Sequence, residues 1–246
     1  MVSNGAFDRS TLIDRLSGLA HERRGPIVFT TSFGLEDQAL TDAIAAAGAP
    51  IDIVTLDTGR LFPETLELWA ETERRYGVRI RSVHPDADAL AALLRDDGAM
   101  GFRDSREARL RCCRVRKVVP LAQALAGAEL WLTGLRGDRG AGSIVADLAW
   151  DDVHRVWKAA PLHDWPREAV AAYCEAHGVP VNPLHAAGMP SIGCQPCTRA
   201  ILPGEDERAG RWWWEAGDTR ECGLHVGPDG RLHRAGRAGP GQGITA

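Results

Sequence analysis

Two pairs of cysteines that lie far apart in the sequence constrain this chain more than any other feature. Cys112 and Cys113 are adjacent, whereas Cys194 and Cys197 form a C-x-x-C pair. Four cysteine thiolates are the usual ligand set of an iron–sulfur cluster or of a structural zinc ion. If all four bind one centre, the fold must bring the two segments together. The alternative is a set of buried cysteines without a metal.

The first cysteine pair lies inside a strongly basic segment. Residues 103–117 contain seven Lys or Arg residues against two acids, Asp104 and Glu107. Cations near a thiol lower its pKa and stabilise the thiolate. The segment therefore suits an anionic thiolate site, and an ordinary solvated basic helix is the competing interpretation.

The composition favours a globular chain with one domain and an appendage. Its 246 residues are 44% hydrophobic, which is enough to bury one full core. The net charge of −4 argues against nucleic-acid binding, because that requires a broad basic face. The sequence shows no secretory leader and no apolar run long enough to span a membrane. We therefore expect a cytoplasmic protein whose six cysteines are metal ligands or catalysts rather than disulfides.

Apolar runs alternate with helical patterns along most of the chain. We expect strands over 27–31, 51–56, 78–83, 129–133 and 155–158, with helices between them, one of which carries the first cysteine pair to about residue 125. This alternation is typical of a parallel sheet that is covered by helices on both faces. Ligands bind such sheets at the carboxyl ends of the strands. Ser32, Asp57 and Arg136 fall at such ends.

The turn after the first strand is a candidate anion site. Ser32, Phe33 and Gly34 separate the strand from a helix, and Glu36 lies in the first helical turn. A short turn of this kind presents backbone N–H groups and the positive end of a helix to a phosphate. A plain connection between strand and helix remains the alternative.

The segment after Cys197 has a different character. Residues 198–225 are rich in Arg, Glu and Trp and lack a sheet pattern, and residues 226–246 are rich in glycine, which predicts a mobile tail. By composition we therefore divide the chain into a domain over 1–197, a C-terminal segment over 198–225 and a tail over 226–246.

The two remaining cysteines lie in different surroundings. Cys222 is flanked by polar residues, which suits an exposed and ionisable thiol, and His225 could hold its thiolate or move a proton. Cys174 shares an apolar helix face with Val170, which predicts a core position.

Three arginines surround the path from Cys197 to Cys222. The planar guanidinium group bonds two oxygens of a sulfate or phosphate at once, which makes arginine a fitting ligand for such anions, although each one taken singly could be a solvated surface residue. The residues are Arg199, Arg208 and Arg211. The three tryptophans at 212–214 favour packing over ligand binding.

Taken together, these motifs resemble the assimilatory adenylyl-sulfate reductases of the phosphoadenylyl-sulfate reductase family. The matching pieces appear in the order of the family between residues 27 and 225. They are the residues 31–38 (TSFGLEDQ), 56–59 (LDTG), Cys112-Cys113 with Lys117, 133–136 (TGLR), 193–199 (GCQPCTR), 207–214 (ERAGRWWW) and 221–225 (ECGLH).

The resemblance implies a fold, a cofactor and a reaction. The fold is α/β, a Rossmann-like parallel sheet of the adenine nucleotide alpha hydrolase (PP-loop) type with a C-terminal extension. The cofactor is one [4Fe-4S] cluster on Cys112, Cys113, Cys194 and Cys197. The reaction reduces adenylyl sulfate to sulfite and AMP with thioredoxin as electron donor.

The resemblance also assigns roles to single residues. Cys222 matches the nucleophile, and Lys117 matches a position beside the substrate or the cluster. The positions implied to contact the substrate are those of the loop, the strand ends and the three arginines: Ser32, Phe33, Gly34, Glu36, Asp57, Arg136, Arg199, Arg208 and Arg211.

One loop departs from the family pattern. Family members carry a second basic residue after the Gly-Leu-Arg motif, whereas here Arg136 is followed by the glycine-rich residues 137–142, in which Arg139 could supply the charge. Three other classes remain as alternatives: a phosphoadenylyl-sulfate reductase without a cluster, a zinc-stapled protein without catalytic activity, and a PP-loop tRNA thiolation enzyme. The sequence leaves homo-oligomerisation open.

Overall fold

A six-stranded sheet forms the centre of the computed structural model, which describes residues 7–137 and 146–215. The strand order is β3-β2-β1-β4-β6-β5. Neighbouring strands are parallel except β5, which pairs antiparallel with β6. The strands are β1 (Ile27–Thr31), β2 (Ile51–Leu56), β3 (Arg81–Val83), β4 (Leu130–Leu132), β5 (Leu148–Asp151) and β6 (Val156–Ala159).

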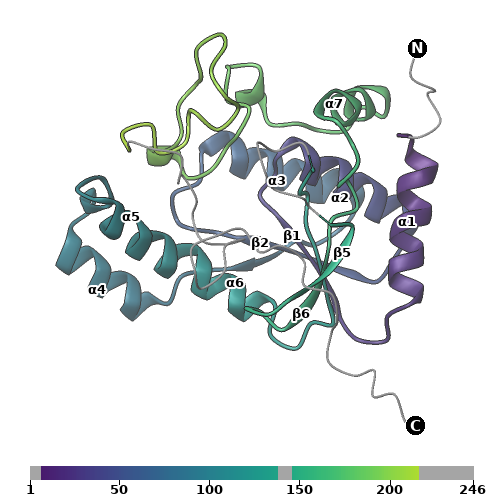
Figure 1. Ribbon diagram of the computed structural model, residues 1–246, viewed down its shortest axis with the longest axis horizontal. Helices are drawn as coiled ribbons and strands as arrows, with labels where there is room; N and C mark the ends of the chain where they lie inside the picture. Colours follow the sequence, from purple (N-terminus) through teal and green to yellow (C-terminus); the bar gives the residue numbers. More distant parts are fainter. Residues whose placement is uncertain (1–6, 138–145, 216–246) are drawn as a thin grey trace.

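Helices cover both faces of the sheet (Figure 1). Helices α1 (Arg9–His21), α2 (Leu35–Ala47), α3 (Pro63–Tyr76) and α7 (Arg167–Ala176) lie on one face. On the other side, α4 (Ala87–Asp97) is followed by a helical run of α5 (Arg106–Cys113), the π-helical turn η2 (Arg114–Val118) and α6 (Val119–Ala124). Three short 3₁₀ turns complete the described elements: η1 (Gly101–Arg103), η3 (Pro183–His185) and η4 (Gln195–Cys197).

Alternating side chains of the strands divide the core into two layers. Ile27 and Phe29 of β1 pack in the larger layer with α1, α2, α3 and α7. Val28 of the same strand packs on the opposite face with Trp131 of β4 and Leu121 of α6. Successive side chains of a strand point to opposite faces, so one continuous apolar run serves both layers.

Side-chain caps begin several of the helices. The carboxylate of Asp8 accepts a hydrogen bond from the Thr11 N–H at 2.8 Å and starts α1. The hydroxyl of Ser105 accepts from the Ala108 N–H at 3.1 Å and starts α5, which leads to the first cysteine pair. Each cap satisfies a backbone donor that has no partner inside the helix.

The strand order reverses direction beside β1. From β1 the chain proceeds to β2 and β3 on one side, and then crosses to β4 on the other side. In open α/β sheets, such a switch point between neighbouring strands opens a crevice at their carboxyl ends, where ligands bind. The switch point here lies between β1 and β4, so this rule predicts a ligand near the loops that follow these two strands.

All five predicted strands are observed in the predicted order, with two corrections to the sheet. The strand expected at 78–83 forms only over Arg81–Val83, and the sheet carries an antiparallel edge strand, β5, that was not predicted. The last expected strand, 155–158, is observed one residue later as β6. Among the described helices, none combines the length and the apolar character needed to cross a membrane.

Candidate functional site

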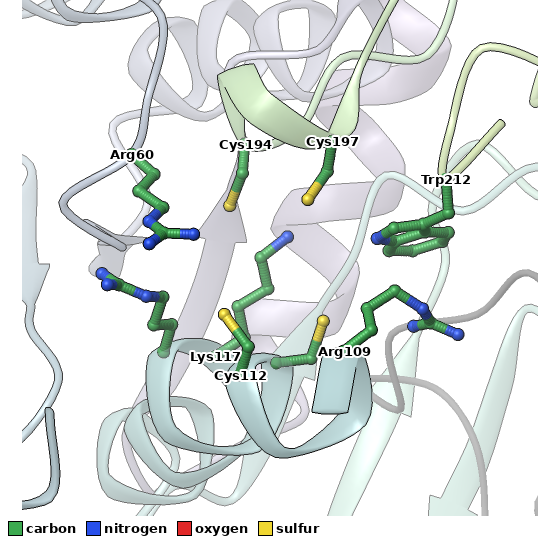
Figure 2. Close-up of a pocket in the computed structure, with 9 residues that line it drawn as sticks. Arg60, Arg109, Cys112, Lys117, Cys194, Cys197 and Trp212 are labelled. Carbon is green, nitrogen blue, oxygen red and sulfur yellow. The ribbon is translucent and has the colours of Figure 1, made fainter. Parts of the chain in front are cut away.

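The four paired cysteines line one pocket, which we call the thiol pocket. Cys112 and Cys113 reach it from the end of α5, and Cys194 and Cys197 reach it from η4 on the opposite side (Figure 2). The remaining lining residues are basic or aromatic: Arg60, Arg109, Arg116, Lys117 and Trp212. The predicted convergence of the two cysteine pairs is therefore observed.

The π-helical turn helps to place Lys117 in the thiol pocket. Lys117 follows Cys113 by four residues, inside η2, where the helix widens. Pro120 lacks the N–H that a regular α-helix would need one turn further on. The amine of Lys117 extends toward the space between the two cysteine pairs (Figure 2). Single π-helical turns inside α-helices occur frequently at functional sites.

Backbone contacts hold η4 beside the carboxyl end of β2. The N–H of Gln195 donates to the carbonyl of Arg60 at 2.8 Å. The hydroxyl of Thr58 lies 3.3 Å from the sulfur of Cys194, and Arg116 donates to the carbonyl of Thr58 at 2.6 Å. The loop after β2 therefore joins both halves of the thiol pocket.

Burial and nearby charges act in opposite directions on the second cysteine pair. Burial raises the pKa of the Cys194 thiol, but Lys117, the hydrogen bond from Thr58, and Arg211 together bring that pKa below its ordinary value. The pKa of the Cys197 thiol is raised to about 11 by burial and by the neighbouring Cys194. Because like charges disfavour each other, two thiolates this close require further positive charge.

Several donors around the thiol pocket have no acceptor. Arg60 Nη1, Arg116 Nε and Trp212 Nε1 are buried and lack a hydrogen-bond partner within the described part of the chain. Buried donors are normally satisfied, so each such group requires an explanation. An anionic group among the four sulfurs would supply the missing acceptors.

The four cysteines surround the thiol pocket without forming a metal-ligand group in the described part of the chain. Among the residues that the structure describes, no group of three or more His, Cys, Asp or Glu side chains is arranged to hold a metal ion. The thiol pocket thus provides four cysteines, cations and unpaired donors around a shared space.

The loop after β1 and the first residues of α2 form the second part of the site, and we call residues 32–37 together the β1–α2 loop. The carboxylate of Asp37 accepts hydrogen bonds from the N–H and the hydroxyl of Ser32, at 2.7 and 2.8 Å. The N–H of Phe33 donates to the Thr31 hydroxyl at 3.0 Å. These two amides of the predicted anion cradle are therefore bonded within the loop, and α2 begins after them with Gly34 as its N-cap residue.

Phe33 adopts a backbone conformation that is unusual for its residue type. Its φ is 59°, and its ring is buried and stacks on Trp69 at 5.8 Å between ring centroids. A bulky residue with positive φ is strained, and such strain gathers at binding loops that the surrounding packing holds in place. The aromatic contact therefore fixes the shape of the loop.

The end of β4 approaches the β1–α2 loop closely. A Cβ atom at Gly134 would lie 2.3 Å from Asp37 Oδ1 and 3.2 Å from Glu36 Cβ. Arg136 is almost completely buried, and its Nε donates to Glu36 Oε1 at 2.7 Å. The structure thus brings Glu36 and Arg136 together, and in this pair the arginine contacts protein. A contact of either residue with a substrate stays a prediction.

The strand-end residue Asp57 supports a turn. Its carboxylate accepts from the Gly59 N–H at 2.8 Å, and His84 Nδ1 lies 3.7 Å from the same carboxylate group. This turn carries Arg60 to the thiol pocket and Thr58 to the sulfur of Cys194. A contact of Asp57 with a substrate stays a prediction.

The three candidate arginines differ in their surroundings. Arg199 forms a bidentate ion pair with Glu205, in which the two N–O distances are 2.8 and 2.9 Å. Arg211 is buried and its guanidinium lies 4.7 Å from the ring centroid of Trp212. The N–H of Arg208 donates to Asp206 at 2.8 Å. Arg211 therefore lies closest to the thiol pocket, through Trp212.

Two predicted site residues cannot be placed. Cys222 and His225 lie outside the described residues, as does Arg139. Cys174 is buried in the larger core, and burial together with Asp42 and Glu36 raises the pKa of its thiol to about 12. The prediction of a core role for Cys174 is confirmed.

The sequence analysis overlooked four residues of the thiol pocket region. Thr58, Arg60, Arg109 and Arg116 contact or line it, but none was proposed as a site residue. Thr58 and Arg60 follow a strand end directly, which was a usable signal. The two arginines lie at helical spacing from Cys113, which places them on its side of the helix.

Comparison with known proteins gives a consistent result. Residues 26–200 match the profile of the phosphoadenosine phosphosulfate reductase domain. The chain is 49% identical over 233 residues to the adenosine 5'-phosphosulfate reductase of Agrobacterium fabrum, covering 91% of this chain and 90% of that protein.

Solved structures share the fold at lower identity. Phosphoadenylyl-sulfate reductase from Candida auris superposes with a TM-score of 0.65 at 23% identity, over 75% of this chain and 88% of that one. Yeast FAD synthetase superposes with a TM-score of 0.52 at 16% identity, over 78% and 65% of the two chains. The predicted Rossmann-like fold of the PP-loop type is confirmed.

Proposed function

The chain belongs to the phosphoadenosine phosphosulfate reductase domain family, and we propose that it reduces adenylyl sulfate to sulfite and AMP with thioredoxin as the electron donor. The observation that carries this proposal is the convergence of four cysteines and Lys117 on one pocket beside the carboxyl end of β2. We also expect the enzyme to act in the cytoplasm, where its thiols stay reduced.

The first chemical step uses Cys222 as the nucleophile. Its thiolate attacks the sulfur atom of adenylyl sulfate, and the bond between that sulfur and the bridging phosphate oxygen breaks. AMP leaves with the bonding electron pair, and Cys222 carries a sulfonate group. The leaving phosphate gains negative charge, which Lys117 and the arginines at 208 and 211 stabilise.

The second step releases sulfite. One thiolate of reduced thioredoxin attacks the sulfur of Cys222, and sulfite departs with the electron pair of the sulfur–sulfur bond. The second thioredoxin thiol then resolves the mixed disulfide and leaves thioredoxin oxidised. The two electrons that reduce the sulfur of the substrate come from this dithiol.

The residues of the thiol pocket fit a [4Fe-4S] cluster on Cys112, Cys113, Cys194 and Cys197. Four cysteine thiolates are the usual ligands of such a cluster, and these four would hold it between α5 and η4. The position of all four cysteines around one pocket and the unpaired donors of Arg60, Arg116 and Trp212 support this proposal. When bound, the cluster supplies negative charge that orients Lys117 and the surrounding donors.

Trapping of the intermediate tests the function. Protein incubated with adenylyl sulfate in the absence of thioredoxin should gain the mass of one sulfonate on the peptide that contains Cys222. Cys222→Ser should retain fold, iron and nucleotide binding but form no sulfite. An adduct on Cys174, or normal sulfite production by Cys222→Ser, would refute this mechanism.

The substrate preference gives an independent test. In this family the two cysteine pairs accompany the substrate without a 3′-phosphate, so kcat/KM should be far higher for adenylyl sulfate than for its 3′-phosphorylated form. A preference for the phosphorylated form would identify the chain as a phosphoadenylyl-sulfate reductase instead.

A further inference from the structure

Four charged side chains form an ion-pair network next to the β1–α2 loop. Arg136 Nε lies 2.7 Å from Glu36 Oε1, and Arg136 Nη2 lies 3.3 Å from Glu207 Oε2. Arg167 bridges the same two glutamates, at 3.7 Å from Glu36 and 3.4 Å from Glu207. Two arginines and two glutamates thus alternate around the network and balance each other in charge.

The inner pair of this network is buried, whereas the outer residues Arg167 and Glu207 are 21% and 45% exposed. The side chains of Arg136 and Glu36 are 2% and 5% exposed, so both charges have lost most of their hydration. Arg167 is the first residue of α7, where the helix dipole disfavours a cation. The two glutamates offset that cost, because they lie next to the guanidinium of Arg167. Buried pairs of this kind serve to fix one arrangement more than to add stability.

The network joins two parts of the site that are distant in sequence. Glu207 belongs to the turn 206–211, in which the N–H of Arg211 donates to the carbonyl of Arg208 at 2.8 Å. The following residue, Trp212, lines the thiol pocket. Glu36 belongs to the β1–α2 loop. Any shift of Glu207 relative to Glu36 would therefore move Arg208 and Arg211 relative to the β1–α2 loop.

We propose that Arg167 and Glu207 are positioning residues: through Arg136 and Glu36 they hold the turn 206–211 in register with the β1–α2 loop, and so place Arg208 and Arg211 against the anionic end of the substrate. This inference rests on the proposed function for the identity of that substrate. None of the motifs in the sequence analysis included Arg167, and Glu207 appeared there only within a matching segment.

Two single variants separate positioning from a simple effect of charge. Arg167→Gln leaves the network one unit more negative, and Glu207→Gln leaves it one unit more positive. If only the charge mattered, an anionic substrate would bind the first variant more weakly and the second more tightly. If the network positions the turn, both variants should raise the KM for adenylyl sulfate about tenfold with little change in kcat.

The double variant and a binding measurement complete the design. Arg167→Gln combined with Glu207→Gln should raise the KM about as much as either single variant, since both remove the same restraint. Calorimetric titration in the Cys222→Ser background gives the Kd for adenylyl sulfate without turnover. If the protein that retains Cys222 binds adenylyl sulfate but forms no sulfite, the proposed function is refuted, and the Kd values still test the network. AMP, which lacks the sulfate, should lose less affinity than adenylyl sulfate.

Asp164→Asn serves as the matched control. The side chain of Asp164 is 44% exposed, close to the 45% of Glu207, and it pairs with Arg15 at 2.7 Å rather than with a member of the network. This variant should keep the KM and Kd of the unmodified protein. Opposite shifts in Arg167→Gln and Glu207→Gln, or unchanged constants in both, would overturn the proposal.

Discussion

The guanidinium of Arg109 and the carboxylate of Glu215 form an ion pair at the edge of the thiol pocket. Their side chains are 1% and 11% exposed, and Arg109 Nη2 lies 3.0 Å from Glu215 Oε2. The guanidinium also lies 4.5 Å from the ring centroid of Trp212. A charge this deeply buried depends on its partner, because water cannot replace it.

Glu215→Gln should therefore destabilise the protein by about 3 kcal/mol, since Arg109 would remain buried without its counter-ion. Urea unfolding at neutral pH measures this difference. Asp52→Asn is the control, because Asp52 pairs with Arg81 at 2.6 Å where both side chains are nearly half exposed, and it should cost less than about 1 kcal/mol. Equal effects of the two substitutions would show that burial of the Arg109–Glu215 pair is unimportant.

Gly134→Ala should also destabilise the protein, by about 2 kcal/mol, because a methyl group there would collide with the Asp37 carboxylate at 2.3 Å. Asp37 would have to move and would lose its bonds to Ser32. A Cβ atom added at Gly18 of α1 would meet no neighbouring atom within 4 Å, so Gly18→Ala should instead stabilise the protein by about 0.5–1 kcal/mol. Thermal unfolding of both variants compares them. If Gly134→Ala leaves the stability unchanged, the β1–α2 loop can move to accommodate the added methyl group.

Most of the sheet could be predicted because its strands are encoded locally. Apolar runs such as Ile27–Thr31 are bounded by glycine, proline or polar residues, and their order fixes the topology. Strand β5 was missed because it forms the edge of the sheet by pairing antiparallel with β6. Trp150 packs on Trp157 across the pair at 5.6 Å, a contact that no local pattern reveals.

The site was predictable in its cysteines but not in its ion pairs. The spacing of Cys194 and Cys197 is visible in the sequence, whereas the partner of an arginine depends on the tertiary fold. Arg109 and Arg111 are two residues apart on α5, yet the side chain of the first is 1% exposed and that of the second 56%. Helix rotation separates them, and the sequence alone does not say which one faces the thiol pocket.

Cys113→Ser should remove the proposed cluster. Protein purified without oxygen should be brown and contain about four irons per chain, and this variant should lose iron and stability because the cluster joins α5 to η4. Cys174→Ala is the control, because Cys174 lies in the core away from the thiol pocket, and it should keep its iron. Anaerobic iron and sulfide analysis decides the matter. A colourless protein with one zinc per chain would contradict the cluster.

Lys158 of β6 lies in an environment that disfavours its charge. Burial lowers the pKa of its amine to about 8, although the neighbouring Asp151 opposes that shift. The ring of Trp131, whose centroid lies 4.5 Å from the amine, also attracts the charged form. The ordinary value is 10.5, so between about pH 8 and 10.5 the unfolded chain binds more protons at this position than the folded chain does. The contribution of this lysine to stability should therefore rise with pH across that window, and it should be lost as the pH falls through 8.

The titration of Lys158 can be observed directly, because the chain contains two lysines, Lys117 and Lys158. Protein labelled at the lysine Cε carbons should give two resonances, of which one disappears in Lys158→Arg and can be assigned. That resonance should titrate with a midpoint near pH 8, because desolvation favours the neutral amine. Urea unfolding gives the difference in free energy of unfolding between Lys158→Met and the unmodified protein. This difference should favour the variant more at pH 7.5 than at pH 9.5. A midpoint near 10.5, together with a difference in stability that does not change with pH, would show that water reaches the amine of Lys158 freely.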